Sequence, residues 1–133
     1  MFHVTRRFEF DSAHRLLGYG GPCRFLHGHH YAVEVTVSGD QLDGLGMLVD
    51  FGELKGVVWG WLKANWDHAA LLSEDDPLLA QTEGAYSMGN RNPTAEVMAE
   101  MSFNGFKTML SSRVKLVRVR LYETPNCWVD YNE

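Results

Sequence analysis

The most informative stretch of the chain reads CRFLHGHHYAVEVTV at residues 23–37. In its second half, residues 31–37 alternate between large apolar side chains and smaller or polar ones. Because successive side chains of a strand point to opposite faces, this alternation predicts a half-buried β-strand. The apolar parity continues back through His29 and His27, so both imidazoles are expected on the apolar side of that strand.

A second alternating segment lies upstream, at residues 2–14, and ends in a third histidine, His14. Its phenylalanines at even positions share the parity of His14, so this segment also predicts a strand with an inward histidine. Glycines and a proline in residues 15–28 predict an irregular loop between the two strands. Three histidines on neighbouring strands are the ligand set of a catalytic zinc with one open position. The sequence therefore predicts a metal site made by His14, His27 and His29.

The other elements follow from hydrophobic periodicity and capping patterns. They are a short strand at 47–49, a helix at 51–65 capped by Asp50, a loop at 73–92, a helix from Asn92-Pro93-Thr94 to about Ser111, and strands at 117–122 and 128–131. This order predicts an α+β fold, an antiparallel sheet with two helices on one face, in one domain over residues 1–133. An apolar-rich sheet with one uncovered face also predicts an oligomer.

Composition limits the classes of function. The net charge of −5 argues against a general nucleic-acid binder, which is usually basic. No apolar run approaches the roughly 20 residues of a membrane span, and the beginning of the chain does not resemble an export signal. Without such a signal, Cys23 and Cys127 are expected to be free thiols in the cytoplasm.

Cys23 has three readings on sequence alone. It stands four residues before His27, where it is either a fourth metal ligand or a nearby acid/base. It could equally be a small buried hydrophobe, as free cysteines often are. The neighbouring cation of Arg24 favours the thiolate and so a functional role. Cys127, on the last strand, is expected to be structural.

Two further positions carry candidate chemistry. Asp67-His68 either ends the first helix or forms a carboxylate–imidazole pair for proton transfer. Glu123 shares the parity of the apolar residues in the strand at 117–122, so its carboxylate is expected to face inward unless the strand end reaches solvent. An inward glutamate suits recognition of an amino-amidine edge, as in a pterin or guanine ring.

Six motifs occur in order along the chain: FDSAHR at 10–15, CRFLHGH at 23–29, VDFGELK at 49–55, WDH at 66–68, NPTAE at 92–96 and YET at 122–124. With these motifs the chain resembles the 6-pyruvoyltetrahydropterin synthase/QueD family over nearly its whole length. The resemblance implies a tunnelling fold (T-fold), in which protomers join through their sheets into a barrel. It also implies a trimer or hexamer with active sites between subunits.

The resemblance also implies a role for each candidate residue. It assigns His14, His27 and His29 as zinc ligands, Cys23 as a catalytic acid/base, Asp67 and His68 as a second proton-transfer pair, and Glu123 as the pterin anchor. The implied reaction is that of a lyase in 7-deazaguanine (queuosine) biosynthesis. It converts 7,8-dihydroneopterin triphosphate to 6-carboxy-5,6,7,8-tetrahydropterin, acetaldehyde and triphosphate.

Alternatives to this activity remain open at the level of sequence. The three-residue gap between Cys23 and His27 favours side-chain cleavage over 6-pyruvoyltetrahydropterin synthase activity, in which triphosphate leaves and the carbon side chain stays intact. A three-histidine iron oxygenase and a non-catalytic pterin- or purine-binding homologue are the other candidates. Residues 79–91 form a longer segment than the family leads us to expect, and a lid there would alter which side chain is accepted.

Overall fold

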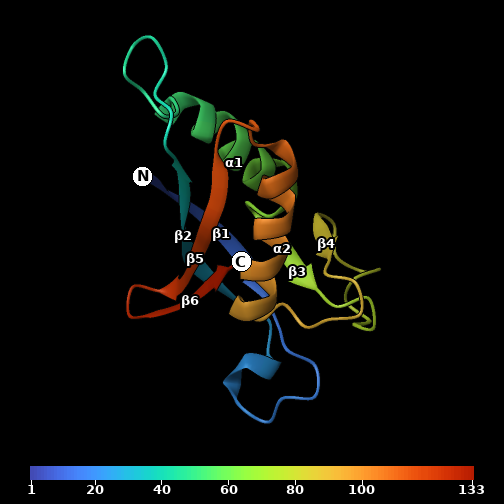
Figure 1. The fold of residues 1–133 in the computed structure, drawn as a ribbon. Coiled ribbons are helices and arrows are strands. Elements are labelled where there is room, and N and C mark those ends of the chain that lie inside the picture. The colour runs from blue at the N-terminus through green and yellow to red at the C-terminus, as the bar shows by residue number, and fades with distance from the viewer.

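The structure is a computed structural model that describes residues 1–133. Its centre is a curled six-stranded sheet in the order β4-β3-β1-β2-β5-β6 (Figure 1). The elements are β1 (Phe2–His14), a 3₁₀ turn (Pro22–Arg24), β2 (His27–Gly39), α1 (Phe51–Asn65), β3 (Ala69–Leu72), β4 (Ala85–Ser87), α2 (Ala95–Met109), β5 (Lys115–Thr124) and β6 (Cys127–Asn132).

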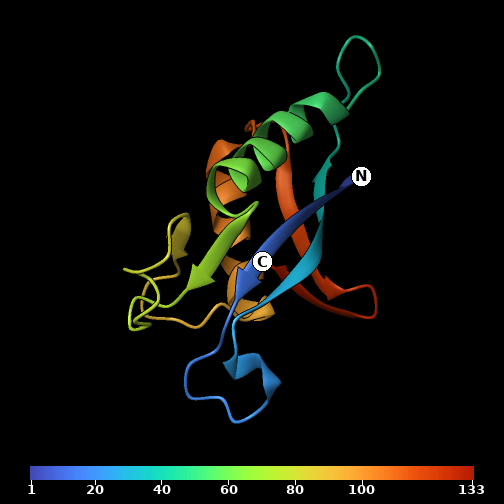
Figure 2. The same cartoon turned by 180° about the vertical axis from the view of Figure 1, so that it is seen from behind.

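The β1–β2 hairpin forms the centre of the sheet. The two strands pair antiparallel along their full lengths, from Phe2 opposite Gly39 to His14 opposite His27. Each places its large apolar side chains on the same face, as the alternation in sequence predicts. The loop between them projects away from the rest of the molecule in both views (Figures 1 and 2).

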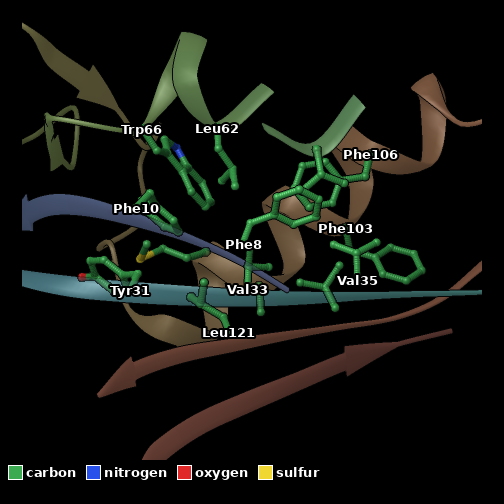
Figure 3. Packing of buried hydrophobic residues seen from close by; sticks show 14 of the residues in the cluster. Phe8, Phe10, Tyr31, Val33, Val35, Leu62, Trp66, Phe103, Phe106 and Leu121 are labelled. Carbon is green, nitrogen blue, oxygen red and sulfur yellow. The ribbon is translucent and has the colours of Figure 1, made fainter. Parts of the chain in front are cut away.

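Both helices pack on the apolar face of the sheet. Figure 3 shows the phenylalanines and valines of the strands meeting Leu62, Trp66, Phe103 and Phe106 in one cluster, which contains 20 buried residues. Each helix begins at a side-chain cap: the Asp50 carboxylate accepts from the Gly52 N–H, and the Thr94 hydroxyl accepts from the Val97 N–H. The helix predicted at 51–65 is confirmed. Neither helix has the length and apolar character that a membrane span requires.

The prediction of a strand at 47–49 is wrong. The Asp43 carboxylate accepts hydrogen bonds from the N–H groups of Leu45 and Met47, which folds this segment into a tight turn. Leu48 and Val49 then lead directly to the helix cap at Asp50. Both are buried, but neither pairs with a neighbouring strand.

The sheet is also mixed rather than wholly antiparallel. No element is predicted from sequence for Ala69–Leu72, which form β3, and β4 lies within the segment predicted as a loop at 73–92. β3 runs parallel to β1, and β4 runs parallel to β3, while the four longer strands pair antiparallel as expected. Strands of four and three residues are too short to give a clear periodic signal, so tertiary pairing decides their structure.

Candidate active site

The ends of β1 and β2 bring three imidazoles together at one end of the sheet. The Nε2 atom of His27 lies 3.1 Å from Nε2 of His14 and 3.0 Å from Nε2 of His29. The cause is the strand register, which places His14 directly opposite His27, and Ser12 opposite His29. All three side chains are on the apolar parity, whereas His30 lies on the other face against Asp11 and Glu9.

Hydrogen bonds at the far side of two rings set their orientation. The Nδ1–H of His14 donates to the Pro93 carbonyl at 2.7 Å, and the Nδ1–H of His27 donates to the Phe25 carbonyl at 2.7 Å. In this tautomer the lone pair is on Nε2, the atom that faces the other rings. Burial lowers the pKa of His14 and of His29, which favours the neutral imidazole that metals bind.

This donor set fits a tetrahedral metal with one open position. Nitrogens bound at 2.0–2.1 Å to a tetrahedral zinc lie roughly 3.3 Å apart, close to the separations between these Nε2 atoms. Metal-binding geometry is therefore available at His14, His27 and His29.

A cavity of about 310 Å³ adjoins this cluster, within the range of small-molecule sites. His14, Cys23 and Glu123 all line it, although they come from β1, the 3₁₀ turn and β5. Cys23 is half-buried and forms no disulfide. The structure thus unites a cluster histidine, a thiol and a carboxylate around one space.

Glu123 reaches this cavity through an irregularity in β5. The register of β5 against β6 shifts between Tyr122 and Thr124, so Glu123 has no partner of its own. Such a bulge redirects a side chain, and the Glu123 carboxylate lies 3.5 Å from Nε2 of His29.

A second irregularity, at Thr36 and Val37 of β2, shifts the register of β5 upstream of Glu123. It explains why Leu116 is buried and Val117, which the alternation placed inward, is only half-buried.

Asp67 and His68 do not line the cavity that contains Cys23 and Glu123. His68 adopts a left-handed backbone conformation (φ 60°) between α1 and β3, and its side chain is 77% exposed. Its Nδ1 is 3.0 Å from an Asp67 carboxylate oxygen, and the other oxygen accepts from the Asp11 N–H at 3.1 Å. The pairing of aspartate with imidazole is therefore present. Yet His68 lines a second cavity, of about 480 Å³, together with His29 and Glu83 rather than with Cys23.

Sequence reasoning missed several groups around His14 and the first cavity. The Pro93 carbonyl and the Tyr31 hydroxyl both approach His14 Nδ1, at 2.7 and 3.3 Å. Thr94, the cap of α2, and Glu96, in its first turn, line the same cavity as Cys23. The NPTAE motif was the available signal for Thr94 and Glu96. No side-chain pattern marks a backbone carbonyl such as that of Pro93. Cys127, expected to be structural, also lines this cavity.

Comparison with known proteins identifies the class. A family model described as 6-pyruvoyl tetrahydropterin synthase matches residues 3–133. The chain therefore belongs to the 6-pyruvoyl tetrahydropterin synthase family. Within it, the chain is similar to 6-carboxy-5,6,7,8-tetrahydropterin synthase of Rickettsia felis, at 39% identity over 98% of this chain and 99% of the relative. The Haemophilus influenzae protein of the same name is 32% identical, over 100% of both chains.

Solved structures agree on the fold. The 6-pyruvoyl tetrahydropterin synthase of Caenorhabditis elegans has a TM-score of 0.75 and 25% identity, covering 99% of this chain and 95% of that one. A catalytic-residue mutant of the Plasmodium vivax 6-pyruvoyltetrahydropterin synthase has a TM-score of 0.71 at 20% identity, covering 100% of both chains. The expectation of a tunnelling fold is confirmed for the single chain, and the barrel of several protomers stays a prediction.

Proposed function

We propose that this protein is a zinc-dependent 6-carboxy-5,6,7,8-tetrahydropterin synthase that acts in the cytoplasm. It would convert 7,8-dihydroneopterin triphosphate and water to 6-carboxy-5,6,7,8-tetrahydropterin, acetaldehyde and triphosphate. The observation that carries the proposal is the convergence of three Nε2 atoms beside a cavity lined by Cys23 and Glu123. Full-length similarity to relatives of that name supports the choice of activity.

His14, His27 and His29 would hold the metal through Nε2. Zinc, when bound, supplies a Lewis acid that polarises an oxygen of the substrate side chain. The Pro93 and Phe25 carbonyls keep two of the rings in the binding tautomer, so the ligands need little rearrangement.

Glu123 would anchor the pterin ring. A carboxylate accepts two parallel hydrogen bonds from an amino-amidine edge, which fixes both the position and the rotation of the ring. Because Glu123 lies 3.5 Å from His29, a ring held there would lie next to the three histidines. Cys23, which lines the same cavity, would move protons on the pterin's side chain.

The Asp67-His68 pair would supply a second proton-transfer group. The carboxylate orients Nδ1, which leaves Nε2 free to accept or donate a proton. Since His68 is exposed and lies outside the cavity with Cys23, we infer that it acts at a site completed by a neighbouring protomer. A homo-oligomer with sites between subunits, a trimer or hexamer, is therefore part of the proposal.

Arg15, Arg24 and Arg91, the basic residues near the site motifs, are the sequence candidates for holding the triphosphate, but other groups of the chain already engage each of them. Arg15 pairs with Asp76, and Arg91 pairs with Glu100. Arg24 donates to the carbonyls of its own loop. Neither cavity has a lysine or arginine in its lining, so a neighbouring protomer is the expected source of positive charge.

The test is incubation of zinc-loaded protein with 7,8-dihydroneopterin triphosphate, followed by mass-spectrometric identification of the pterin. Formation of 6-carboxytetrahydropterin supports the proposal. A 6-pyruvoyl product would instead identify the related synthase activity. Tight pterin binding without turnover would identify a binding homologue, and iron content with oxygen consumption would identify an oxygenase.

A further inference from the structure

The loop that carries Cys23 has almost no core packing of its own. It leaves the sheet after His14 and returns at His27, projecting away from the helices and strands (Figures 1 and 2). No residue of its 3₁₀ turn is buried, and Phe25 and Leu26 are exposed. Hydrophobic burial therefore does not fix the position of Cys23, and polar contacts at the base of the loop have to do so.

The first of these contacts is an ion pair to the segment after β3. The Arg15 guanidinium donates through two nitrogens to the two carboxylate oxygens of Asp76, with Nε at 2.6 Å from Oδ2. The Asp76 side chain is 0% exposed. Its Oδ1 also accepts from the Leu78 N–H at 2.9 Å, which holds the carboxylate in a fixed turn. A two-point pair to a buried, immobile carboxylate restrains both the position and the rotation of the arginine.

The second contact is made by Asn92. Its Oδ1 accepts from the Leu17 N–H at 3.0 Å, and its Nδ2 donates to the Leu17 carbonyl at 2.9 Å. Between these anchors, the Leu16 N–H donates to the Cys23 carbonyl at 2.9 Å. Residues 15–17 are thus tied to the segment between β3 and α2, and the returning side of the loop is tied to them at Cys23.

We propose that the Arg15–Asp76 ion pair and the Asn92 hydrogen bonds form a clamp that holds Cys23 in the cavity it shares with Glu123. Arg15, Asp76 and Asn92 are positioning residues in this inference, which rests on the proposed catalytic role of Cys23. The long segment 73–92 then serves as the anchor of the Cys23 loop. The backbone of His14 does not depend on the clamp, because strand pairing with His27 and Leu71 holds it.

The decisive variant is the double substitution Arg15→Met and Asp76→Leu, which removes the pair without leaving a buried charge unpaired. We expect the variant to keep one zinc per chain. Its kcat should fall roughly 10- to 100-fold with KM little changed, because a small displacement of a reacting group has that effect. Iodoacetamide should alkylate Cys23 several-fold faster than in the wild-type protein, measured by peptide-resolved mass spectrometry. Arg15→Lys, which keeps the charge and loses the two-point geometry, should be intermediate.

A matched control is available in Arg120→Met with Asp130→Leu. That pair has the same residue types and the same two-point geometry, but it joins β5 to β6 away from the loop. It should leave kcat and Cys23 alkylation unchanged. If the Arg15/Asp76 variant does not fold, Asn92→Ala provides the same measurements without disturbing the buried carboxylate.

A folded clamp variant with wild-type kcat and a wild-type alkylation rate would overturn the proposal. Loss of zinc together with activity would also overturn it, since the clamp would then be acting on the metal ligands. Failure of the proposed function is distinguishable: the wild-type protein would be inactive on the pterin triphosphate, while the alkylation comparison would still report on the clamp.

Discussion

At the scale of single residues, the proposed metal centre depends on which nitrogen of each imidazole is free. Strand parity predicted that His14, His27 and His29 face the apolar side, and the structure brings their Nε2 atoms together. Parity could not reveal that the Pro93 and Phe25 carbonyls select the tautomer, because any residue type offers such a carbonyl. The sequence therefore predicted which histidines converge. It did not predict the carbonyl groups that orient them.

Comparison of His27→Ala with Cys23→Ala separates the proposed metal ligand from the proposed proton-transfer group. His27→Ala should lose zinc and activity together, since it removes one of three ligands. Cys23→Ala should keep one zinc per chain while kcat falls roughly 10²- to 10⁴-fold, the usual contribution of an acid/base group. Metal analysis and steady-state kinetics on the same preparations provide the check. Loss of zinc in Cys23→Ala would mean that the thiol is a ligand.

Asp76 should make the stability of the protein depend on acid pH. Its hydrogen bonds from Arg15 lower the pKa of its carboxyl below the usual value. As the pH falls, the Asp76 carboxyl of the unfolded chain therefore binds a proton before that of the folded protein does. The contribution of Asp76 to the free energy of unfolding is complete above about pH 4 and is lost as the pH falls through the lower pKa of the folded state. Urea unfolding at several pH values should show the difference between wild type and Asp76→Asn shrinking below about pH 4. A difference that stays constant with pH would contradict this.

At the scale of elements, long periodic segments were predicted well and short or irregular ones were not. Residues 2–14 repeat the two-residue alternation of a strand several times, and residues 51–65 repeat the helical spacing of apolar residues over several turns. These repeats are long enough to define a strand and a helix. β3 and β4 are set by pairing with β1 and with each other, which local sequence does not encode. The bulge at Glu123 was also invisible, although the inward position of its carboxylate was anticipated.

The cap of α1 gives a prediction about an element far from the chemistry. The Asp50 carboxylate accepts from the Gly52 N–H at 2.7 Å. Asp50→Ala should lower the free energy of unfolding by about 1 kcal/mol and leave kcat unchanged, because α1 does not line the cavity with Cys23. Chemical denaturation and the pterin assay measure the two effects, and Asp50→Asn, which keeps an accepting oxygen, should recover most of the stability. A fall in kcat at unchanged stability would contradict a purely structural role.

At the scale of the whole molecule, the location of His68 is the strongest argument for an assembly. Within one chain, His68 and Cys23 line different cavities, and neither cavity contains a basic side chain of lysine or arginine. The prediction of one domain over residues 1–133 and the prediction of an oligomer stay predictions.

Mixing inactive variants tests the shared site. Cys23→Ala and His68→Ala should each be nearly inactive alone. After the two are dissociated and reassembled together, some sites combine an intact Cys23 with an intact His68 from a neighbour, so part of the activity should return. Remixed Cys23→Ala alone is the control. No recovery in a mixture shown to contain mixed oligomers would place both residues in the site of one chain.

The most direct measurement of the proposed activity is the yield of acetaldehyde from 7,8-dihydroneopterin triphosphate. Acetaldehyde forms only when the side chain is cleaved, so it separates this reaction from triphosphate elimination alone. The zinc-loaded protein is predicted to release acetaldehyde and triphosphate in equal amounts as 6-carboxytetrahydropterin accumulates. Release of triphosphate with a 6-pyruvoyl pterin and no acetaldehyde would contradict the assignment.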